Sequence, residues 1–259
     1  MKKTVQNLYV VSNRMLNKDH ALLELKSDLP LEGINPGQFV NVLTDNANAV
    51  FLRRPFSIYQ VDYKQNTIQL LIKVVGEGTK YLSKCVVGES INVIFPLGIG
   101  FTIPEKKSKV LLVGGGVGVA ALMILASELY KSGHLVDILL GARSADSLIE
   151  LDAFSRYGLV HTTTEDGSFG MKGFVTTHPI WAEKIDSFDK IYCCGPEPMM
   201  KAVAGLADLA NKDCEVSLEN SMACGYGVCL CCVTKTSEGH KCVCSDGPVF
   251  NSKELIWQN

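Results

Sequence analysis

The sequence predicts a protein of the α/β plus β class with three parts in order. These are an antiparallel β-barrel over residues 1–103, an α/β domain with a parallel sheet over 104–212, and a small metal-binding lobe over 213–259. Three observations predict this arrangement. Short β-rich runs separated by turn signals fill the first part, and strands alternate with helices around a glycine-rich turn in the second. Most of the cysteines fall in the third.

The composition is that of a globular protein with several cores. The chain has 259 residues, of which 47% are hydrophobic and 20% charged, and its net charge is −2. This charge gives no indication of a nucleic-acid partner. No apolar run is long enough for a membrane span, and the first residues lack the apolar core of a signal peptide. Many cysteines without an export signal favour the reducing cytoplasm.

The first part is predicted to contain six strands with little helix between them, which is typical of an antiparallel barrel. One or two helical turns are expected at Gly78–Lys84. The expected strands are Thr4–Val11, Ala21–Lys26, Gln38–Leu43, Phe56–Val61, Thr67–Val75 and Ser90–Phe95.

Two segments of the barrel are candidates for binding an anion. Arg53–Tyr59 places a guanidinium, a rigid proline, an aromatic ring and a hydroxyl at the start of a strand, and arginine suits bidentate pairing with a pyrophosphate. Lys73–Thr79 places two glycines before an expected helix start. Taken alone each signal is weak, because an Arg-Pro pair usually begins a strand and Gly-x-Gly usually forms a turn.

The second part begins with a buried strand from Lys109, a turn containing Gly114, Gly115, Gly116 and Gly118, and a helix expected to reach about Lys131. Such a turn lets a phosphate approach the backbone at a helix start. It is not a complete G-x-G-x-x-G, because the sixth residue is Val119. The alternation then continues with Leu135–Leu140 (strand), Asp146–Phe154 (helix), Leu159–Thr163 (strand), Thr176–Lys184 (helix), Lys190–Cys193 (strand) and Glu197–Leu209 (helix).

Cys194, Gly195 and Pro196 directly follow the strand Lys190–Cys193. They therefore lie where the carboxyl ends of parallel strands bind ligands. The plainer interpretation of this cysteine is a buried thiol near a strand end, which is a common place for cysteine.

The cysteines of the third part have metal-ligand spacing. Cys224, Cys229 and Cys232 form C-x4-C-x2-C, the plant-type [2Fe–2S] pattern. Gly225 and Gly227 let the backbone wrap tightly around a cluster, because glycine reaches positive φ without steric cost. A structural zinc site is the main alternative, although such sites usually pair two short Cys hooks.

The fourth ligand is left open by the spacing. Cys242 and Cys244 are two residues apart and share a face of an extended segment, so either could serve. Cys231 lies inside the C-x2-C hook and is expected to be a spectator.

With these motifs in hand, the chain resembles the ferredoxin-NADP reductase superfamily and, within it, the electron-transfer subunits of type B dihydroorotate dehydrogenases. Arg54-Pro55-Phe56-Ser57 matches the superfamily's flavin motif, and the glycine turn and Cys194-Gly195-Pro196 match its nicotinamide motifs. Met222–Cys232 with Val243–Phe250 matches the cluster lobe, and this match selects Cys244 as the fourth ligand. Ala121 departs from the proline that relatives often carry.

The resemblance implies FAD on the barrel, NAD(H) on the α/β domain and a [2Fe–2S] cluster in the lobe. It implies an FMN-containing dihydroorotate dehydrogenase catalytic subunit as partner, in a heterotetramer of two copies of each chain that serves pyrimidine (UMP) biosynthesis. Electrons would pass from that FMN through the cluster and FAD to NAD+, with no catalytic side chain in this protein. Arg54 would hold the FAD pyrophosphate and Ser57 would reach flavin N5. The flavin site would be completed by Leu71, Ile72, Lys73, Gly78 and Thr79.

Two other functions fit the same motifs. The chain is also similar to the small subunit of NADH-dependent ferredoxin:NADP oxidoreductase or of sulfide dehydrogenase, which keeps the cofactors and changes the partner. A zinc-bound, nucleotide-sensing module is the alternative of a different class. Arg143-Ser144 would not by itself forbid the 2′-phosphate of NADP. Phe250 is expected either to anchor the partner interface or to pack under the cluster loop.

Overall fold

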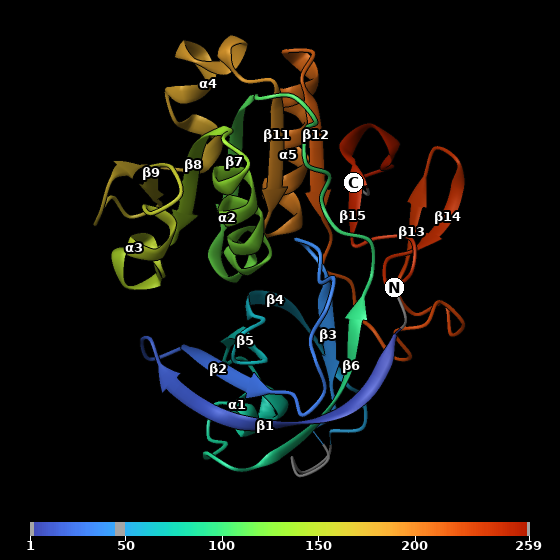
Figure 1. The fold of residues 1–259 in the computed structure, drawn as a ribbon. Coiled ribbons are helices and arrows are strands. Elements are labelled where there is room, and N and C mark those ends of the chain that lie inside the picture. Colours follow the sequence, from blue (N-terminus) through green and yellow to red (C-terminus); the bar gives the residue numbers. More distant parts are fainter. Residues whose placement is uncertain (1–2, 45–49, 258–259) are drawn as a thin grey trace.

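The computed structural model describes residues 3–44 and 50–257 (Figure 1). The first part is a closed antiparallel barrel with strand order β1-β2-β5-β4-β3-β6, so the predicted six-stranded barrel is confirmed. Its elements are β1 (Thr4–Met15), β2 (His20–Lys26), β3 (Phe39–Val42), β4 (Arg54–Asp62), β5 (Thr67–Lys73), the helix α1 (Glu77–Leu82) and β6 (Ser90–Leu97).

The second part is built on a seven-stranded sheet with the order β10-β9-β8-β7-β11-β12-β15, in which all neighbours are parallel except β12 and β15. The central strands are buried apolar runs, as parallel strands covered on both faces require. The sheet contains β7 (Lys109–Gly115), β8 (Leu135–Ala142), β9 (Leu159–Thr164), β10 (Met171–Lys172), β11 (Lys190–Cys194), β12 (Asp213–Ser217) and β15 (Val249–Asn251).

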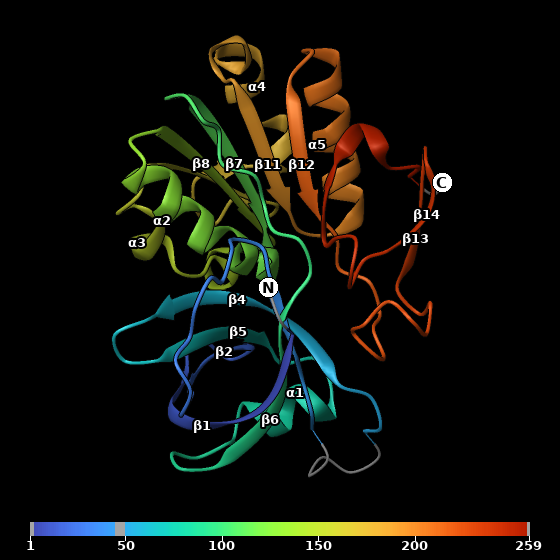
Figure 2. The same ribbon diagram turned by 45° about the vertical axis from the view of Figure 1, so that its right-hand side comes forward.

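Helices cover both faces of this sheet (Figure 2). Side chains of β7 alternate between the two sides: Val110 and Leu112 pack with α2, whereas Leu111 and Val113 pack with α5 and α4. The helices are α2 (Met123–Lys131), α3 (Leu151–Phe154), α4 (Ile180–Glu183) and α5 (Glu197–Leu209). No helix in the described ranges is long and apolar enough to cross a membrane.

Three expected helices are shorter than the sequence predicted. The glycine turn leads into a 3-10 helix, Gly116–Leu122, and α-helical geometry begins only at α2. The expected helix Asp146–Phe154 is interrupted by Glu150, whose left-handed backbone (φ 60°) separates a 3-10 turn from α3. The expected helix Thr176–Lys184 is interrupted at His178, which is extended because Pro179 follows it.

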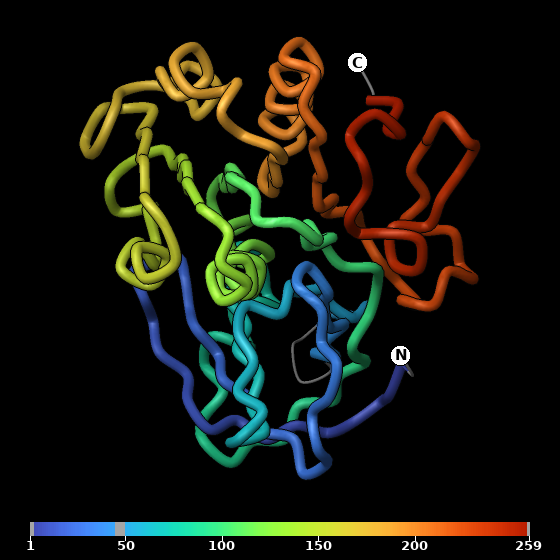
Figure 3. Tube along the Cα trace, turned by 45° about the horizontal axis from the view of Figure 1, so that its top comes forward, coloured from blue at the N-terminus to red at the C-terminus, as the bar shows by residue number. Residues whose placement is uncertain are grey.

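The third part contains a long loop and a hairpin of β13 (Val233–Thr236) and β14 (Gly239–Cys242), beside the sheet in Figures 1 and 3. The interval 213–259 assigned to this lobe also contains β12 and β15, which belong to the large sheet. The lobe is therefore continuous with the sheet through two strands. The limits 1–103, 104–212 and 213–259 stay a proposal.

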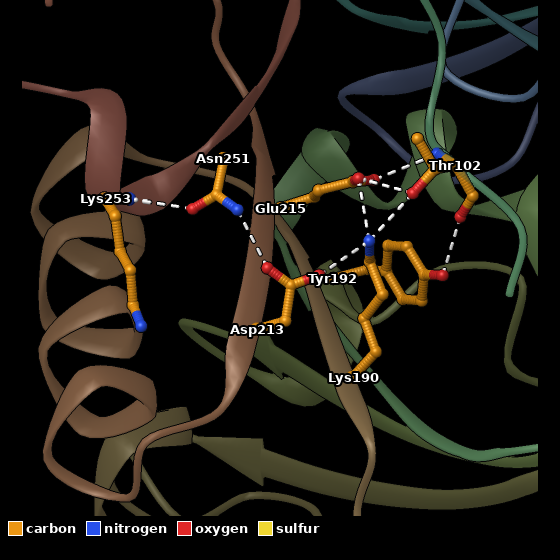
Figure 4. Close-up of polar contacts among 7 residues, drawn as sticks. All are labelled: Thr102, Lys190, Tyr192, Asp213, Glu215, Asn251 and Lys253. Carbon is orange, nitrogen blue, oxygen red and sulfur yellow. Dashed lines mark hydrogen bonds and ion pairs between the residues drawn. The ribbon is translucent and has the colours of Figure 1, made fainter.

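A polar network holds the barrel-to-sheet linker against β11 and β12 (Figure 4). The ammonium of Lys190 lies 2.8 Å from carboxylate oxygens of both Asp213 and Glu215, and it donates to the hydroxyl of Thr102 at 2.8 Å. Glu215 in turn accepts from the Thr102 backbone N–H at 3.0 Å, and the Tyr192 hydroxyl donates to the Thr102 carbonyl at 2.7 Å. The linker is thereby fixed at the amino-terminal ends of these strands.

Candidate cofactor-binding site

A cavity of about 760 Å³ lies where the barrel, the large sheet and the segment after β12 meet. It brings together residues from the flavin motif, the glycine turn and the Cys-Gly-Pro motif. Among the predicted binding residues, those lining it are Arg54, Pro55, Phe56, Ser57, Leu71, Lys73, Thr79, Gly115, Gly116, Gly118, Gly195 and Pro196.

Four other predicted residues lie behind the cavity wall. Ile72 is fully buried in the barrel core, and Cys194, the last residue of β11, is fully buried within the sheet domain. Gly114 and Gly78 are also buried and make room for their neighbours. None of these four residues lines the cavity, so any contact that they make with a ligand has to come from the backbone.

The barrel side of the cavity has a cradle for an anionic group. Arg54 begins β4 and donates through Nη1 to the carbonyl of Leu52 at 2.8 Å, which holds the guanidinium near the cavity mouth. A Cβ placed on Gly78 would lie 3.3 Å from Thr44 Oγ1 and 3.6 Å from Arg54 Nε, so glycine keeps this space open. Thr44 Oγ1 is buried and has no hydrogen-bond partner among the described residues. Such an orphaned hydroxyl is a candidate partner for a group bound beside Arg54.

Thr79 shapes the turn that closes this cradle. Its hydroxyl accepts hydrogen bonds from the backbone N–H groups of Val75 and Gly76, at 2.9 and 3.1 Å, and donates to the Gly76 carbonyl at 3.0 Å. The side chain is therefore occupied in holding the loop between β5 and α1. Its contribution to a ligand site is mainly to position the backbone.

On the sheet side, two glycine segments approach each other so closely that side chains are excluded. A Cβ on Gly118 would lie 2.7 Å from both the Cα and the N of Gly195, and 2.8 Å from the carbonyl carbon of Cys194. A Cβ on Gly114 would lie 2.8 Å from Val119 Cγ1. Both are closer than real Cβ contacts, so only glycine permits this packing. The result is a cavity wall formed by backbone without side chains, which suits a pyrophosphate.

The cysteine loop follows the same wall. Met222 lines the cavity, and Cys224 is two residues further along the chain. The Asn41 side chain in β3 donates to the carbonyl of Ala223 at 3.3 Å, which ties the start of the loop to the barrel. The loop is therefore held by the barrel on one side and by the sheet on the other.

Backbone N–H groups of the loop point at its sulfurs. Tyr226 N–H donates to Cys224 Sγ at 3.3 Å, Gly227 N–H to Cys244 Sγ at 3.2 Å and Cys244 N–H to Cys232 Sγ at 3.4 Å. Gly227 has the positive φ, 83°, that aims its N–H inward. N–H donors to ligand sulfurs are what an iron–sulfur cluster requires to stabilise its negative charge.

The thiols interact in two pairs, Cys224 with Cys229 and Cys232 with Cys244. Burial opposes ionisation of Cys224, but hydrogen bonds from Tyr226 N–H and from Cys229 lower its pKa to about 6. No three Cys, His, Asp or Glu side chains in the described ranges are grouped to hold one metal ion. Two pairs of thiols would suit a two-iron cluster, in which each iron takes two protein ligands.

Each of the three parts of the chain matches a known protein family. Residues 7–100 match a model described as oxidoreductase FAD-binding domain, and residues 112–205 match oxidoreductase NAD-binding domain. Residues 219–256 match iron-sulfur cluster binding domain of dihydroorotate dehydrogenase B. The chain is 38% identical, over 97% of its length and 98% of the relative, to the electron transfer subunit of dihydroorotate dehydrogenase B (NAD+) from Fusobacterium nucleatum.

The chain belongs to the family of dihydroorotate dehydrogenase B electron transfer subunits. The homologous subunit of Caldanaerobacter subterraneus is 41% identical over 96% of this chain and 97% of its own. A solved structure of an NADH-dependent reduced ferredoxin-NADP oxidoreductase is similar with a TM-score of 0.87 and 32% identity, covering 96% of this chain and 90% of that one. A ferredoxin reductase of carbazole 1,9a-dioxygenase shares the fold, with a TM-score of 0.69 and 22% identity.

As a member of this family, the chain is an NAD-linked flavin and iron–sulfur oxidoreductase subunit that uses FAD, NAD(H) and an iron–sulfur cluster. The name that its relatives carry, electron transfer subunit, implies a catalytic partner subunit. The zinc alternative loses its support, because the matched domain binds an iron–sulfur cluster. The residues of the cavity and of the cysteine loop fit these groups, although which side chains contact them stays a prediction.

Two further cysteines and one phenylalanine of the lobe have other contacts. The thiols of Cys231 and Cys242 each lie 3.6 Å from a backbone carbonyl, of Ser221 and Gly227 respectively. Phe250 is 4% exposed, lies on β15 opposite Val216, and packs in the core shared with the sheet. Of its two expected roles, packing under the cluster loop is the one that this position supports.

Sequence reasoning missed Glu219, which lines the cavity two residues after the end of β12. The surrounding protein raises the pKa of its carboxyl, and the nearby charge of Lys73 partly opposes this rise. A polar residue just beyond the carboxyl end of a parallel strand was the available signal. Glu219 could have been predicted from this signal if β12 had been recognised as a further strand of the sheet.

Proposed function

We propose that this chain receives electrons from an FMN-containing catalytic subunit that oxidises dihydroorotate, and passes them to NAD+. The names of its relatives support this function, in pyrimidine (UMP) biosynthesis. The assembly would contain two copies of each subunit. The chain's own residues hold the cofactors in sequence, so that single-electron transfer through the cluster and hydride transfer to NAD+ take place at separate positions.

The observation that carries the proposal is the continuity between the cavity and the cysteine loop. Met222 lines the cavity, and Cys224 follows two residues later, so their Cα atoms are at most about 7 Å apart. The proposed cluster and the proposed flavin site therefore share one stretch of backbone. FAD, when bound, supplies the exchange between single electrons and the hydride that NAD+ requires.

Each wall of the cavity has a separate task in this proposal. Arg54 and Thr44 bind the FAD pyrophosphate, and Ser57 orients the reacting part of the flavin. The backbone around Gly118 and Gly195 binds the nicotinamide nucleotide opposite it. Cys224, Cys229, Cys232 and Cys244 hold the [2Fe–2S] cluster, and the N–H donors of the loop stabilise its charge.

The partner docks on the exposed side of the cysteine loop. Val228 and Leu230 flank Cys229 and are 77% and 64% exposed, and Tyr226 nearby is 42% exposed. Large apolar side chains concentrated on one loop favour a protein interface. Because Cys229 is exposed in their midst, the partner's cofactor can approach the cluster there.

Serine replacement of the four cluster ligands tests the site. Cys224→Ser and Cys244→Ser should lose the [2Fe–2S] absorbance and its electron-spin signal, and Cys229→Ser and Cys232→Ser should do the same. Cys231→Ser and Cys242→Ser are matched controls that should keep both signals. Bleaching by Cys242→Ser with retention in Cys244→Ser would show that the fourth ligand is misassigned.

Arg54→Ala tests the flavin site. It should weaken FAD retention by about 10- to 100-fold, because a charge-assisted hydrogen bond to phosphate contributes on the order of 1.5–3 kcal/mol. Ser57→Ala should keep FAD and slow hydride exchange with NADH. FAD content measured after dialysis gives the first result and stopped-flow reduction gives the second. An unchanged FAD content in Arg54→Ala would contradict the proposed site.

The function is tested with and without the partner. Alone, the chain should oxidise NADH with artificial acceptors and ignore dihydroorotate. With an FMN-bearing dihydroorotate dehydrogenase subunit added, dihydroorotate should reduce NAD+. Turnover of dihydroorotate by the isolated chain would overturn the proposal.

A second candidate is the corresponding subunit of an NADH-dependent ferredoxin:NADP oxidoreductase. The similarity of one such solved structure over 96% of this chain favours it. Purifying the chain from its own cells and identifying the protein that accompanies it separates the two candidates. A dihydroorotate dehydrogenase supports the first function, and a larger flavin reductase subunit supports the second.

A further inference from the structure

Asn41 lies on the outer face of the barrel, where the barrel contacts the cysteine loop. It belongs to β3, and its two neighbours on this strand, Val40 and Val42, are part of the barrel core. Because side chains alternate along a strand, Asn41 faces the same way as Phe39, which lines the cofactor cavity. Its amide donates to the carbonyl of Ala223 at 3.3 Å. Asn41 therefore lies between the cavity and the loop.

The surroundings of Asn41 are apolar. The apolar cluster on this face contains Phe39, Ile94 and Leu97 of the barrel together with Met222, Val243 and Phe250. Asn41 is fully buried, and its Oδ1 has no hydrogen-bond partner among the described residues. Burying an unpaired polar atom costs free energy that an apolar side chain of the same size would not cost. The stability of the contact therefore does not explain an asparagine at this position.

The amide also fits closely against the glycine that follows Cys224. A Cβ placed on Gly225 would lie 3.3 Å from Asn41 Nδ2 and 3.1 Å from Leu97 Cδ1. Gly225 also has a positive φ of 74°, which favours glycine. The hydrogen bond to the Ala223 carbonyl is made just before Cys224, and the close approach at Gly225 just after it. The Asn41 amide thus lies beside the residues on both sides of a proposed cluster ligand.

A directional contact at this place has a consequence for electron transfer. Apolar contacts are non-directional, so they leave the exact position of the loop on the barrel less defined than a hydrogen bond does. A single buried asparagine in the apolar interface of a coiled coil likewise fixes the register of the helices at a cost in stability. We propose that Asn41 is a positioning residue, which fixes the cysteine loop on the barrel and thereby sets the distance between FAD and the cluster. The inference rests on the proposed function, because it takes FAD to bind in the cavity and Cys224 to bind the cluster.

Asn41→Leu tests this role in the purified full chain with FAD and cluster. Leucine is similar in size and removes both polar groups, so both cofactors should stay bound and Tm should not fall. In stopped-flow experiments, NADH should reduce FAD at the wild-type rate. The following reduction of the cluster should slow by up to about 100-fold, which is the scale of loss that a displacement of about 1 Å can cause.

Two further variants accompany this test. Asn41→Asp has the same shape and keeps an oxygen but loses the donor to Ala223, so its cluster reduction should slow in the same way. Its added negative charge should also lower the reduction potential of the cluster, which an electron-spin titration measures. Gln65→Ala removes an exposed amide from the turn between β4 and β5, and this matched control should behave as wild type.

Hydrogen–deuterium exchange gives a second measurement that does not depend on electron transfer. The N–H groups of Tyr226 and Gly227, which donate to cysteine sulfurs, should exchange faster in Asn41→Leu, whereas the β13–β14 hairpin should exchange as in wild type. Wild-type cluster reduction in Asn41→Leu, or slowed reduction without faster exchange in the loop, would overturn the inference. A wild-type chain in which NADH reduces FAD but never the cluster would instead refute the proposed function, and the exchange rates would still test the contact.

Discussion

Lys190→Met should destabilise the chain strongly, because it removes the cation from a largely buried network (Figure 4). The Lys190 side chain is 13% exposed, and that of Glu215 is 9% exposed. Removing one partner of a buried ion pair typically costs about 3–5 kcal/mol, since the other charge stays buried and unpaired. Two features reduce this cost. Asp213 is 46% exposed and can be solvated, and Glu215 still accepts from the backbone and hydroxyl of Thr102.

The free energy of unfolding should therefore fall by about 2–3 kcal/mol, which lowers Tm by roughly 4–12 °C for a chain of this size. Differential scanning calorimetry of the FAD-loaded protein measures the shift. Adding Glu215→Gln to Lys190→Met should recover part of the loss, because it removes the unpaired charge. Lys241→Met is the matched control: Lys241 pairs at 2.8 Å with a 70% exposed Glu238, so the loss should stay under about 1 kcal/mol. Equal losses in the two lysine variants would refute the reasoning.

Two other predictions concern packing and pH. Gly118→Ala should lower the free energy of unfolding by about 1–3 kcal/mol and weaken NADH binding, because its methyl group would meet the Gly195 backbone. Gly205→Ala, in open space on α5, is the control and should raise the free energy of unfolding by up to about 1 kcal/mol. Calorimetry and NADH titration compare the two variants. Burial lowers the pKa of both His161 and His178 in the folded chain. Below pH 6.5 these histidines therefore bind protons more readily in the unfolded chain, and the free energy of unfolding falls as the pH falls. Urea unfolding between pH 7.5 and 5 should therefore show a flatter pH dependence in the double Gln variant, and an unchanged slope would contradict this.

The fold was predictable because local patterns determine most of it. The barrel runs are β-rich and bounded by turns, and the central strands of the sheet are apolar throughout, so neither class was ambiguous. The interruption at Glu150 was not predictable, because a left-handed glutamate depends on tertiary contacts. Its carboxylate accepts from the buried Tyr59 hydroxyl at 2.8 Å and lies 3.6 Å from Arg14, both in the barrel. Nothing in the sequence of residues 146–154 indicates those partners.

Some residues of the candidate site were likewise predictable from local sequence, and others were not. Motifs whose chemistry is local, such as the glycine turn and the cysteine hook, could be proposed from spacing alone. Thr44 and Glu219 were missed, because their significance comes from segments distant in the sequence. Thr44 matters because Gly78 leaves space beside its hydroxyl, and Glu219 matters because it lines the same cavity as Lys73 of the barrel.

The two ends of β12 have different tasks in the proposed arrangement of the three cofactors. At its amino-terminal end, Asp213 and Glu215 fix the strand to the barrel linker through Lys190. At its carboxyl end the chain continues through the cavity wall into the cysteine loop. Motion between the barrel and the sheet is therefore restrained on the side away from the cavity. We therefore expect the distance from the proposed flavin site to the proposed cluster, which the residues between Ser217 and Cys224 connect, to change little when a nucleotide enters between the walls.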